Sequence, residues 1–109
     1  MGGRLQMLRS KRDFAALQGA GRSRMHPLLI VRFIRNDFGR DRFGISTGRR
    51  LGSAVVRNRI RRRIRGILRG IDRSASSGWD ILVVARPASA TASYAELRSA
   101  LEQLIATLA

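Results

Sequence analysis

Arginine is the residue whose number and spacing in this chain of 109 residues could do chemistry. Nine arginines fall within residues 49–69, RRLGSAVVRNRIRRRIRGILR, and no acidic residue lies between Asp41 and Asp72. Like charges at this density repel one another, and no acid is spaced to relieve them along a helix. A guanidinium offers a planar fork of N–H donors that fits the oxygens of a phosphate. The segment therefore predicts a surface for a polyanion, and a solvated face that binds nothing is the alternative.

An amphipathic helix must position these arginines. Apolar residues recur along the segment at spacings of three or four, which is typical of a helix packed on a core. Ser53 precedes them and is a favourable N-cap, so we expect a helix that continues to about residue 71. A disordered basic tail has no core to satisfy and would not alternate in this way. The apolar stripe is Val56, Ile60, Ile64, Ile67 and Ile71, and the opposite side carries Asn58, Arg62, Arg65 and Arg69.

The composition of the whole chain extends the same argument. The net charge is +15, from 22 basic and seven acidic residues, and every basic residue except Lys11 is an arginine. Such a charge is typical of a nucleic-acid partner. The chain has no cysteine, which excludes disulfides and thiolate chemistry. Its apolar runs are too short to span a membrane, and its first residues lack the apolar core of a signal peptide, so we expect a cytoplasmic protein.

Turn residues and hydrophobic patterns predict the other elements. A short helix over residues 11–18 precedes an apolar strand over 28–34 and a second strand over 42–47, and these two strands are expected to form an antiparallel hairpin. Residues 79–85 form a nearly continuous apolar strand, expected at the centre of the sheet. Ser93 caps a last helix over residues 94–108. The predicted fold is α+β: one domain, residues 1–109, with a small sheet covered by helices in the order α-β-β-α-β-α.

No set of side chains suited to catalysis is evident. The seven acidic residues are scattered singly, without the paired spacing that general acid–base chemistry needs. The single histidine, His26, has no histidine or cysteine at metal-ligand spacing, so a surface or strand-end role is favoured over metal binding. We predict no catalytic residue and no metal site on this chain. If the protein takes part in a reaction, another molecule provides most of the chemistry.

Aromatic side chains could add base stacking to the phosphate contacts. Phe33 and Trp79 are expected in the core, whereas Phe14 is left open between the core and the wall of a cleft. Arg32 interrupts an otherwise apolar strand face, which is costly unless that face opens to a partner. Residues 44, 46 and 48 are small and would allow a close approach to the sheet.

Four segments in this order closely resemble the protein component of bacterial ribonuclease P. The first is MLRSKRDF, and it is followed by FGISTGRRLGSAVVRNRIRRRIR, WDILVVARPA and YAELRSAL, so the similarity covers almost the whole chain. The most specific part is the tripeptide Arg57-Asn58-Arg59, placed after a basic loop and a strand of small residues. The resemblance implies a compact α/β sandwich with a left-handed β-α-β crossover at the arginine helix, a hand that a sequence pattern alone would not predict.

The resemblance also implies a function. The family binds a large catalytic RNA, ribonuclease P RNA, and together they remove the 5′ leader from precursor tRNA. The RNA performs the hydrolysis with Mg²⁺, which is bound mainly by the RNA and the substrate. The expected partners are therefore this RNA and precursor tRNA, with no DNA and no membrane.

Two groups of site residues follow from the resemblance, residue by residue. The arginine helix and the loop before it are expected to face the catalytic RNA, and a cleft between the first helix and the sheet is expected to receive the single-stranded leader. The RNA-facing residues are Arg49, Arg50, Arg57, Asn58, Arg59, Arg61, Arg62 and Arg65, and the leader-cleft residues are Phe14, Arg32, Ser46 and Arg86.

The chain departs from the family pattern at two positions. Gln18 stands where relatives often carry a second aromatic residue, one turn after Phe14, and Arg32 stands where many carry an aromatic. With fewer stacking groups and one more charge, leader binding is expected to depend more on phosphate contacts.

Two other functions compete with this interpretation. A structural RNA-binding protein of the ribosomal type fits the charge and size equally well, and only the segment order and the lack of basic extensions argue against it. A DNA-binding transcription factor is disfavoured because the helix offers hardly any side chain except Asn58 that could read a base edge.

Overall fold

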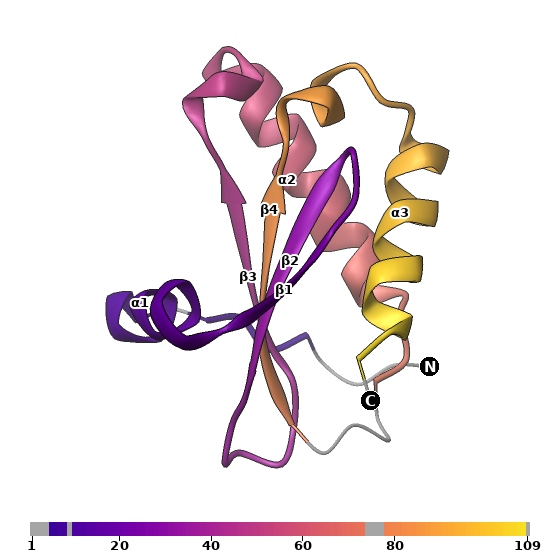
Figure 1. Cartoon of the computed structure of the whole chain (residues 1–109). Coiled ribbons are helices and arrows are strands. Elements are labelled where there is room, and N and C mark those ends of the chain that lie inside the picture. The colour runs from indigo at the N-terminus through magenta and orange to yellow at the C-terminus, as the bar shows by residue number, and fades with distance from the viewer. Residues whose placement is uncertain (1–4, 9, 74–77, 109) are drawn as a thin grey trace.

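The structure is a computed structural model that describes residues 5–8, 10–73 and 78–108. These residues form three α-helices and a four-stranded sheet (Figure 1). One short 3₁₀ turn precedes the arginine helix, and another precedes the last helix. The elements in chain order are α1 (Lys11–Ala20), β1 (Arg22–Met25), β2 (Leu29–Arg35), β3 (Arg42–Thr47), η1 (Arg49–Leu51), α2 (Ala54–Arg69), β4 (Trp79–Ala85), η2 (Pro87–Ala90) and α3 (Tyr94–Ala106).

The strand order in the sheet is β1-β2-β4-β3. The central place of β4 confirms the prediction from its apolar sequence. The predicted hairpin between residues 28–34 and 42–47 is wrong, because β4 lies between these strands, antiparallel to β2 and parallel to β3. A strand in the middle of a sheet covered on both faces must have apolar residues that can be buried on both faces. β4 meets this condition, because four consecutive residues, from Asp80 to Val83, are buried.

The hairpin that does form joins β1 to β2, and β1 is absent from the predicted order α-β-β-α-β-α. Its sequence, RSRM, is exposed at every residue and carries no apolar alternation that would predict a strand. The turn is closed by a hydrogen bond from the His26 amide to the Leu29 carbonyl (2.8 Å), and His26 Nδ1 accepts from the Leu28 amide (3.0 Å). His26 therefore lies at the end of a strand, as predicted, in the turn between β1 and β2.

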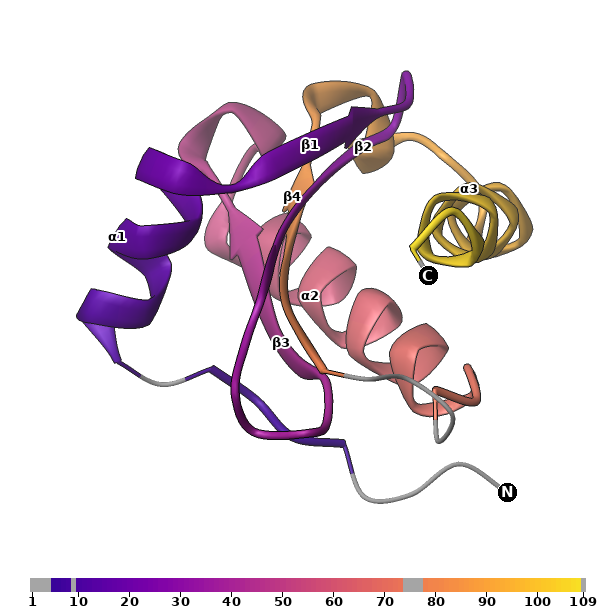
Figure 2. The same cartoon turned by 60° about the horizontal axis from the view of Figure 1, so that its bottom comes forward.

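Alternation along the strands divides the core between the two faces of the sheet. One face, with Val31, Phe33 and Val83, packs against α2 and α3. The other face packs against α1, and its fully buried residues include Leu17 and Leu82. Figure 2 shows α2 and α3 together on one side of the sheet and α1 on the other. Because α1 is short, it covers only part of its face.

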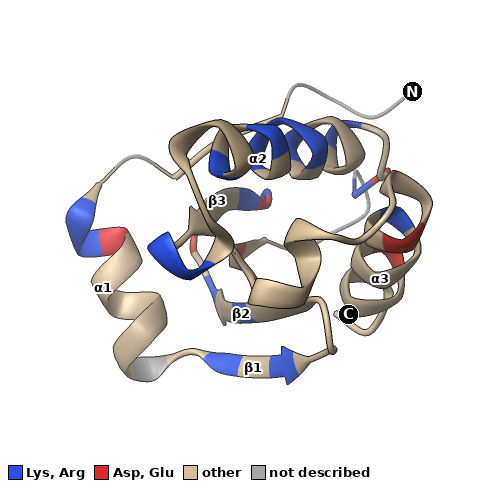
Figure 3. Cartoon of the chain, turned by 90° about the horizontal axis from the view of Figure 1, so that it is seen from above, with Lys and Arg blue, Asp and Glu red and all other residues tan. Residues whose placement is uncertain are grey.

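The connection from β3 through α2 to β4 is a parallel crossover between neighbouring strands. With both strands pointing up in Figure 1, β4 lies to the right of β3 and α2 passes behind the sheet, as the view from above in Figure 3 also shows. The crossover is left-handed, as the family resemblance implied, and opposite to the usual hand.

Side-chain caps begin the two long helices as predicted. Ser53 Oγ accepts from the Val56 amide (3.3 Å) at the start of α2. At α3, Ser93 Oγ accepts from the Glu96 amide (3.1 Å), and the Glu96 carboxylate accepts from the Ser93 amide (2.9 Å). This backbone hydrogen bond lowers the pKa of Glu96. Both helices end slightly earlier than predicted, α2 at Arg69 and α3 at Ala106.

A buried ion pair ties together segments that are distant in the sequence. Arg73 Nε donates to Asp41 Oδ2 (2.6 Å), and Arg73 Nη1 donates to the carbonyl of Leu108 beyond α3 (3.0 Å). Asp41 Oδ1 also accepts from the Trp79 amide at the start of β4 (2.9 Å). The pair thus holds the entrance of the two parallel strands to the end of the last helix.

Candidate nucleic-acid interface

The buried side of α2 confirms the helix phase predicted from the sequence. Ile60 and Ile64 are fully buried, and Ile67 and Leu68 are nearly so, whereas Val56 and Ile71 at the ends of the stripe are only half-buried. Arginines, drawn in blue in Figure 3, recur along α2 over several turns. The residues predicted on this outer side, Asn58, Arg62, Arg65 and Arg69, are all exposed.

Two arginines on the flanks of α2, Arg59 and Arg61, are held by hydrogen bonds to the protein. Arg61 donates to Thr47 Oγ1 at the end of β3 and to Asn58 Oδ1 (2.8 Å). Arg59 donates through Nη2 to the carbonyl of Ala90 in η2 (3.3 Å). The Nε atoms of Arg57 and Arg59 are buried without a hydrogen-bond partner among the described residues. Because their stems are half-buried and their guanidinium groups are hydrogen-bonded, Arg59 and Arg61 are held more rigidly than free surface arginines.

The loop before α2 presents the two remaining arginines of the predicted RNA surface. Arg49 and Arg50 lie on η1 and are exposed, while Leu51 next to them is buried and anchors the turn. Gly52 follows with φ of 130°, a conformation that favours glycine, and so lets the chain turn into the N-cap of α2. Arg49 and Arg50 are therefore next to the first turn of the arginine helix.

Strand register brings the predicted cleft residues onto the face that α1 partly covers. Leu82 of β4 pairs with Arg32 of β2 on one side and with Gly44 of β3 on the other. Two residues further along β4, Val84 pairs with Ile30 and Ser46 in the same way. Leu82 belongs to the cluster under α1, so Arg32 and Ser46 lie on that same face by alternation. Both are half-buried, and they border a strip of sheet that α1 leaves open.

Two further residues complete this strip. Met25 on β1 pairs with Ile30 and is 68% exposed; sequence reasoning missed it because it missed β1. Arg86, directly after β4, donates from Nη1 to the carbonyl of His26 (3.3 Å), so its guanidinium lies beside the β1–β2 turn. Arg32, Ser46, Arg86 and Met25 therefore lie along the same strip of the sheet.

Phe14 extends from α1 to the edge strand β3. Its ring packs on Gly44 so closely that a Cβ at position 44 would approach ring carbon Cε1 to 2.7 Å. The side chain is half-buried, at the border of the small cluster under α1. The sequence left open whether Phe14 belongs to the core or to the wall of a cleft. In the structure, one part of the side chain packs on the core cluster and another part is exposed.

A groove of about 400 Å³ lies between Phe14 and the arginine helix, beside β3. The N-terminal segment forms part of it, because Met7 bridges to Phe43 and extends the sheet beyond β3. Arg61, Arg65 and Arg69 line the opposite wall. The predicted leader cleft and the predicted RNA-binding helix thus border on each other. Arg69 was not among the predicted site residues, although its spacing of four from Arg65 could have indicated it.

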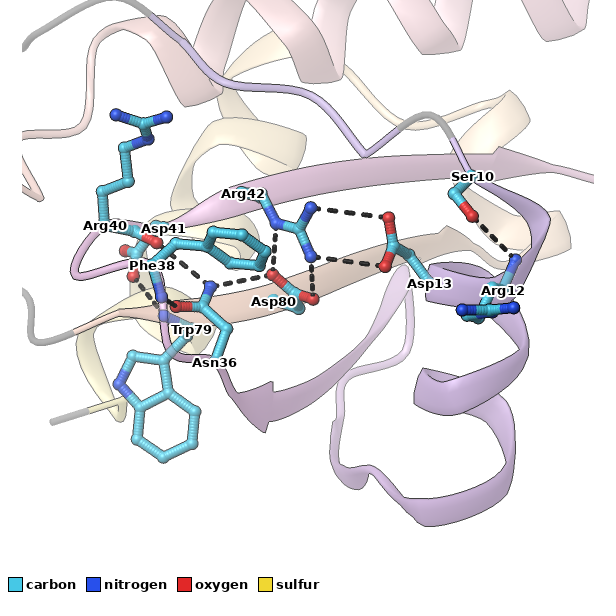
Figure 4. A network of polar contacts seen from close by, with 10 residues as sticks. All are labelled: Ser10, Arg12, Asp13, Asn36, Phe38, Arg40, Asp41, Arg42, Trp79 and Asp80. Carbon is cyan, nitrogen blue, oxygen red and sulfur yellow. Dashed lines mark hydrogen bonds and ion pairs between the residues drawn. The ribbon is translucent and has the colours of Figure 1, made fainter.

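A network of charged groups fixes α1 beside the sheet (Figure 4). Arg42 on β3 donates to both carboxylate oxygens of Asp80 (2.8 and 2.6 Å) and to both oxygens of Asp13 on α1 (3.4 Å each). The ring of Phe38 lies 4.1 Å from the guanidinium carbon of Arg42. The hydrogen bonds to Asp80 raise the pKa of Arg42. The sequence showed Asp13 and Asp80 only as isolated acids, and nothing in their spacing indicated that one arginine joins them.

The family model described as Ribonuclease P matches residues 3–109. The chain belongs to the ribonuclease P protein family. Among its relatives, the ribonuclease P protein component of Herpetosiphon aurantiacus is 35% identical over 102 residues, which cover 94% of this chain and 83% of the relative. That of Alkaliphilus metalliredigens is 32% identical over 98 residues, covering 90% and 88%.

Solved structures of ribonuclease P proteins share the fold. The protein from Staphylococcus aureus superposes with a TM-score of 0.83 at 26% identity, covering 95% of each chain. The protein from Thermotoga maritima superposes with a TM-score of 0.78 at 28% identity, covering 91% of this chain and 94% of its own. The four-stranded sheet, the three α-helices and their connections are therefore those of the ribonuclease P protein family.

The donor groups of this ribonuclease P family member do not form a metal centre in the described part of the chain. Histidine, cysteine, aspartate and glutamate side chains do not gather there in groups of three or more that could hold a metal ion. Asp13 and Asp80 already share Arg42, and Asp41 is paired with Arg73. Among the described helices, none is long and apolar enough to cross a membrane.

Proposed function

We propose that this chain is the protein subunit of a bacterial ribonuclease P and that it acts in the cytoplasm. In this role it binds the catalytic RNA and the 5′ leader of precursor tRNA, and so assists removal of the leader. The observation that carries the proposal is the stiff guanidinium surface of α2 in a chain that matches the family over residues 3–109. A structural RNA-binding protein would need such a surface too, but the family match favours ribonuclease P.

The outer side of α2 and the turn η1 are the proposed contact with the catalytic RNA. Their arginines are exposed or held at the flanks by Thr47, Asn58 and Ala90. Guanidinium groups fixed in this way lose little conformational entropy when they bind phosphates. RNA backbone is the partner that matches a surface of one charge sign with few groups able to read bases.

The open strip of sheet beside α1 is the proposed site for the leader. A single strand is favoured there because the strip combines apolar and aromatic surface for bases with guanidinium groups for phosphates. Phe14 and Met25 supply the apolar contacts, and Arg32 and Arg86 supply the charge. With one aromatic side chain instead of a cluster, binding depends strongly on the phosphates.

Magnesium is assigned in this proposal to the RNA subunit and the substrate, where it supports hydrolysis of the phosphodiester bond. The protein side chains hold no suitable ligand set in the described residues. Their task is to bind the leader and to offset phosphate repulsion between two RNA molecules, which is most needed when few divalent ions are present.

The test is cleavage of precursor tRNA by the catalytic RNA at low magnesium, with and without this protein. We expect no cleavage by RNA-free protein, little by the RNA alone, and strong cleavage when both are present. Full activity of protein from which all RNA has been removed would contradict the assignment of catalysis to the RNA. A protein that leaves cleavage unchanged and co-purifies with ribosomal subunits would instead support the structural alternative.

A further inference from the structure

We propose that Asp13 is a positioning residue, which fixes α1 through Arg42 and thereby sets the place of Phe14 over β3. The inference rests on the proposed binding of the leader beside Phe14. It assigns a role to an acid that lies on a surface proposed for a polyanion.

Arg42 provides a rigid base for this contact. It makes two hydrogen bonds to Asp80, at 2.8 and 2.6 Å, which hold its guanidinium plane against the central strand. Asn36 Nδ2 donates to the same carboxylate (2.8 Å) and to the carbonyl of Arg40 (3.1 Å). Phe38 covers Arg42 with its ring. Figure 4 shows the guanidinium lying between the two carboxylates, so one side of Arg42 is fixed to the sheet and the other faces α1.

Asp13 is the adjustable arm of the network. Both of its hydrogen bonds to Arg42 are 3.4 Å long, and its side chain is 25% exposed. Paired charged hydrogen bonds are usually shorter, so this contact is the weaker of the two that Arg42 makes. It nevertheless joins the first turn of α1 to β3, in the residue directly before Phe14.

The rest of α1 provides few other attachments. Leu17 is its one fully buried side chain among those described, and Phe14 is half-buried. Lys11, Arg12 and Gln18 are exposed. Leu17 therefore fixes the second half of the helix, and Asp13 fixes the first half. Because the Phe14 ring rests directly on Gly44, a small shift of the first half changes what the ring can contact.

The charge of Asp13 makes the proposal testable by the sign of an effect. A carboxylate beside a leader repels phosphates, so its neutralisation should strengthen leader binding if electrostatics alone decides. If Asp13 acts by positioning Phe14, the same change should weaken binding. The two explanations predict opposite directions.

The experiment compares Asp13→Asn with Asp37→Asn in the complex reconstituted with the catalytic RNA. Asp37 lies exposed in the loop between β2 and β3, and its substitution removes the same charge. We expect Asp13→Asn to lower affinity for precursor tRNA roughly three- to ten-fold, a part of the loss of a stacked base. Affinity for mature tRNA and for the catalytic RNA should stay the same. Asp37→Asn should leave all three unchanged or slightly stronger.

Two further variants separate positioning from a general loss of structure. In a Phe14→Ala background, Asp13→Asn should cause no additional loss of precursor affinity, because the residue that it positions is already gone. Asp13→Glu, which keeps the charge, should retain most of the affinity.

Several outcomes would overturn the inference. They are an unchanged or increased precursor affinity in Asp13→Asn, a further loss in the Phe14→Ala background, and a parallel loss of catalytic-RNA binding. If instead the wild-type complex binds precursor and mature tRNA equally, the proposed leader site itself is wrong. The wild-type complex could instead bind precursor tRNA more tightly than mature tRNA through Phe14, while Asp13→Asn behaves like Asp37→Asn. In that case only the positioning role of Asp13 is wrong.

Discussion

Arg59 and Arg62 are three residues apart on α2 but are held in different ways. Arg62 is exposed, whereas Arg59 is half-buried and donates to the carbonyl of Ala90. We expect Arg62→Ala to weaken binding of the catalytic RNA with no change in melting temperature, and to lower the salt slope by about one unit per lost phosphate contact. Arg59→Ala should weaken binding and also lower the melting temperature slightly. Titrations at several salt concentrations and thermal melts check both.

The sequence alone predicts a purely RNA-facing role for Arg59, and the structure amends this. If Arg62→Ala destabilises the fold as much as Arg59→Ala does, the assignment of the outer side of α2 to RNA is wrong.

Phe14 and Arg32 should differ in how salt affects their contribution. A stacked base is worth about 1–3 kcal/mol by alanine substitution, so Phe14→Ala should weaken precursor tRNA binding about ten-fold or more, with little salt dependence. Arg32→Ala should have a similar effect that fades at high salt, because it contributes charge. Mature tRNA, which has no leader, is the control. Equal losses for both tRNAs would make Phe14 a structural residue.

The arrangement of these site residues was predictable only in part. The phase of the arginines follows from the apolar stripe, which repeats over several turns and leaves one orientation of the helix. The Arg42 network could not be predicted, since Asp13 and Asp80 are 29 and 38 residues away from Arg42. Contacts at such separations depend on which elements become neighbours in the fold, and the residue pattern of a single element does not determine that.

At the scale of elements, α2 offers a direct comparison of its two sides. Ile64 is fully buried in the main core, and Arg65 beside it is exposed. We expect Ile64→Ala to cost about 2–5 kcal/mol of unfolding free energy, because it leaves a cavity in the core. Arg65→Ala should cost far less and instead reduce RNA affinity. Denaturant unfolding of both variants measures the difference, and similar costs would mean that α2 is not packed as an amphipathic helix.

The elements that sequence reasoning missed or misplaced share a physical cause. β1 has no apolar face of its own; it is held by pairing with β2 and by Arg24 stacking on the ring of Phe33 (5.3 Å). The hairpin expected between β2 and β3 was the nearest pairing along the chain. The structure instead inserts β4, because the most apolar strand gains most from two neighbours. By contrast, the caps Ser53 and Ser93 accept from amides only three residues further along the chain and were predicted correctly.

At the scale of the whole molecule, the ion pair between Arg73 and Asp41 closes the end of the sheet opposite to η1. Its side chains are 16% and 3% exposed. Removing one partner of a buried pair leaves an uncompensated charge, so Arg73→Met should cost on the order of 3–5 kcal/mol. The control is Arg98→Met, whose partner Glu102 is exposed, with an expected cost below about 1 kcal/mol. Equal melting temperatures of the two variants would contradict this role.

β4, which lies between β2 and β3 in the sheet, is the last strand to be synthesised. β2 and β3 both pair with β4 and not with each other, although both precede it in the chain. During synthesis on the ribosome, β1 and β2 can already form their hairpin, whereas β3 and α2 have no sheet to join until residues 79–85 have emerged. Until then the arginines of α2 belong to a segment without a core. The ordered arginine surface therefore exists only after translation has passed β4, and a nascent chain that stops before Trp79 cannot display it.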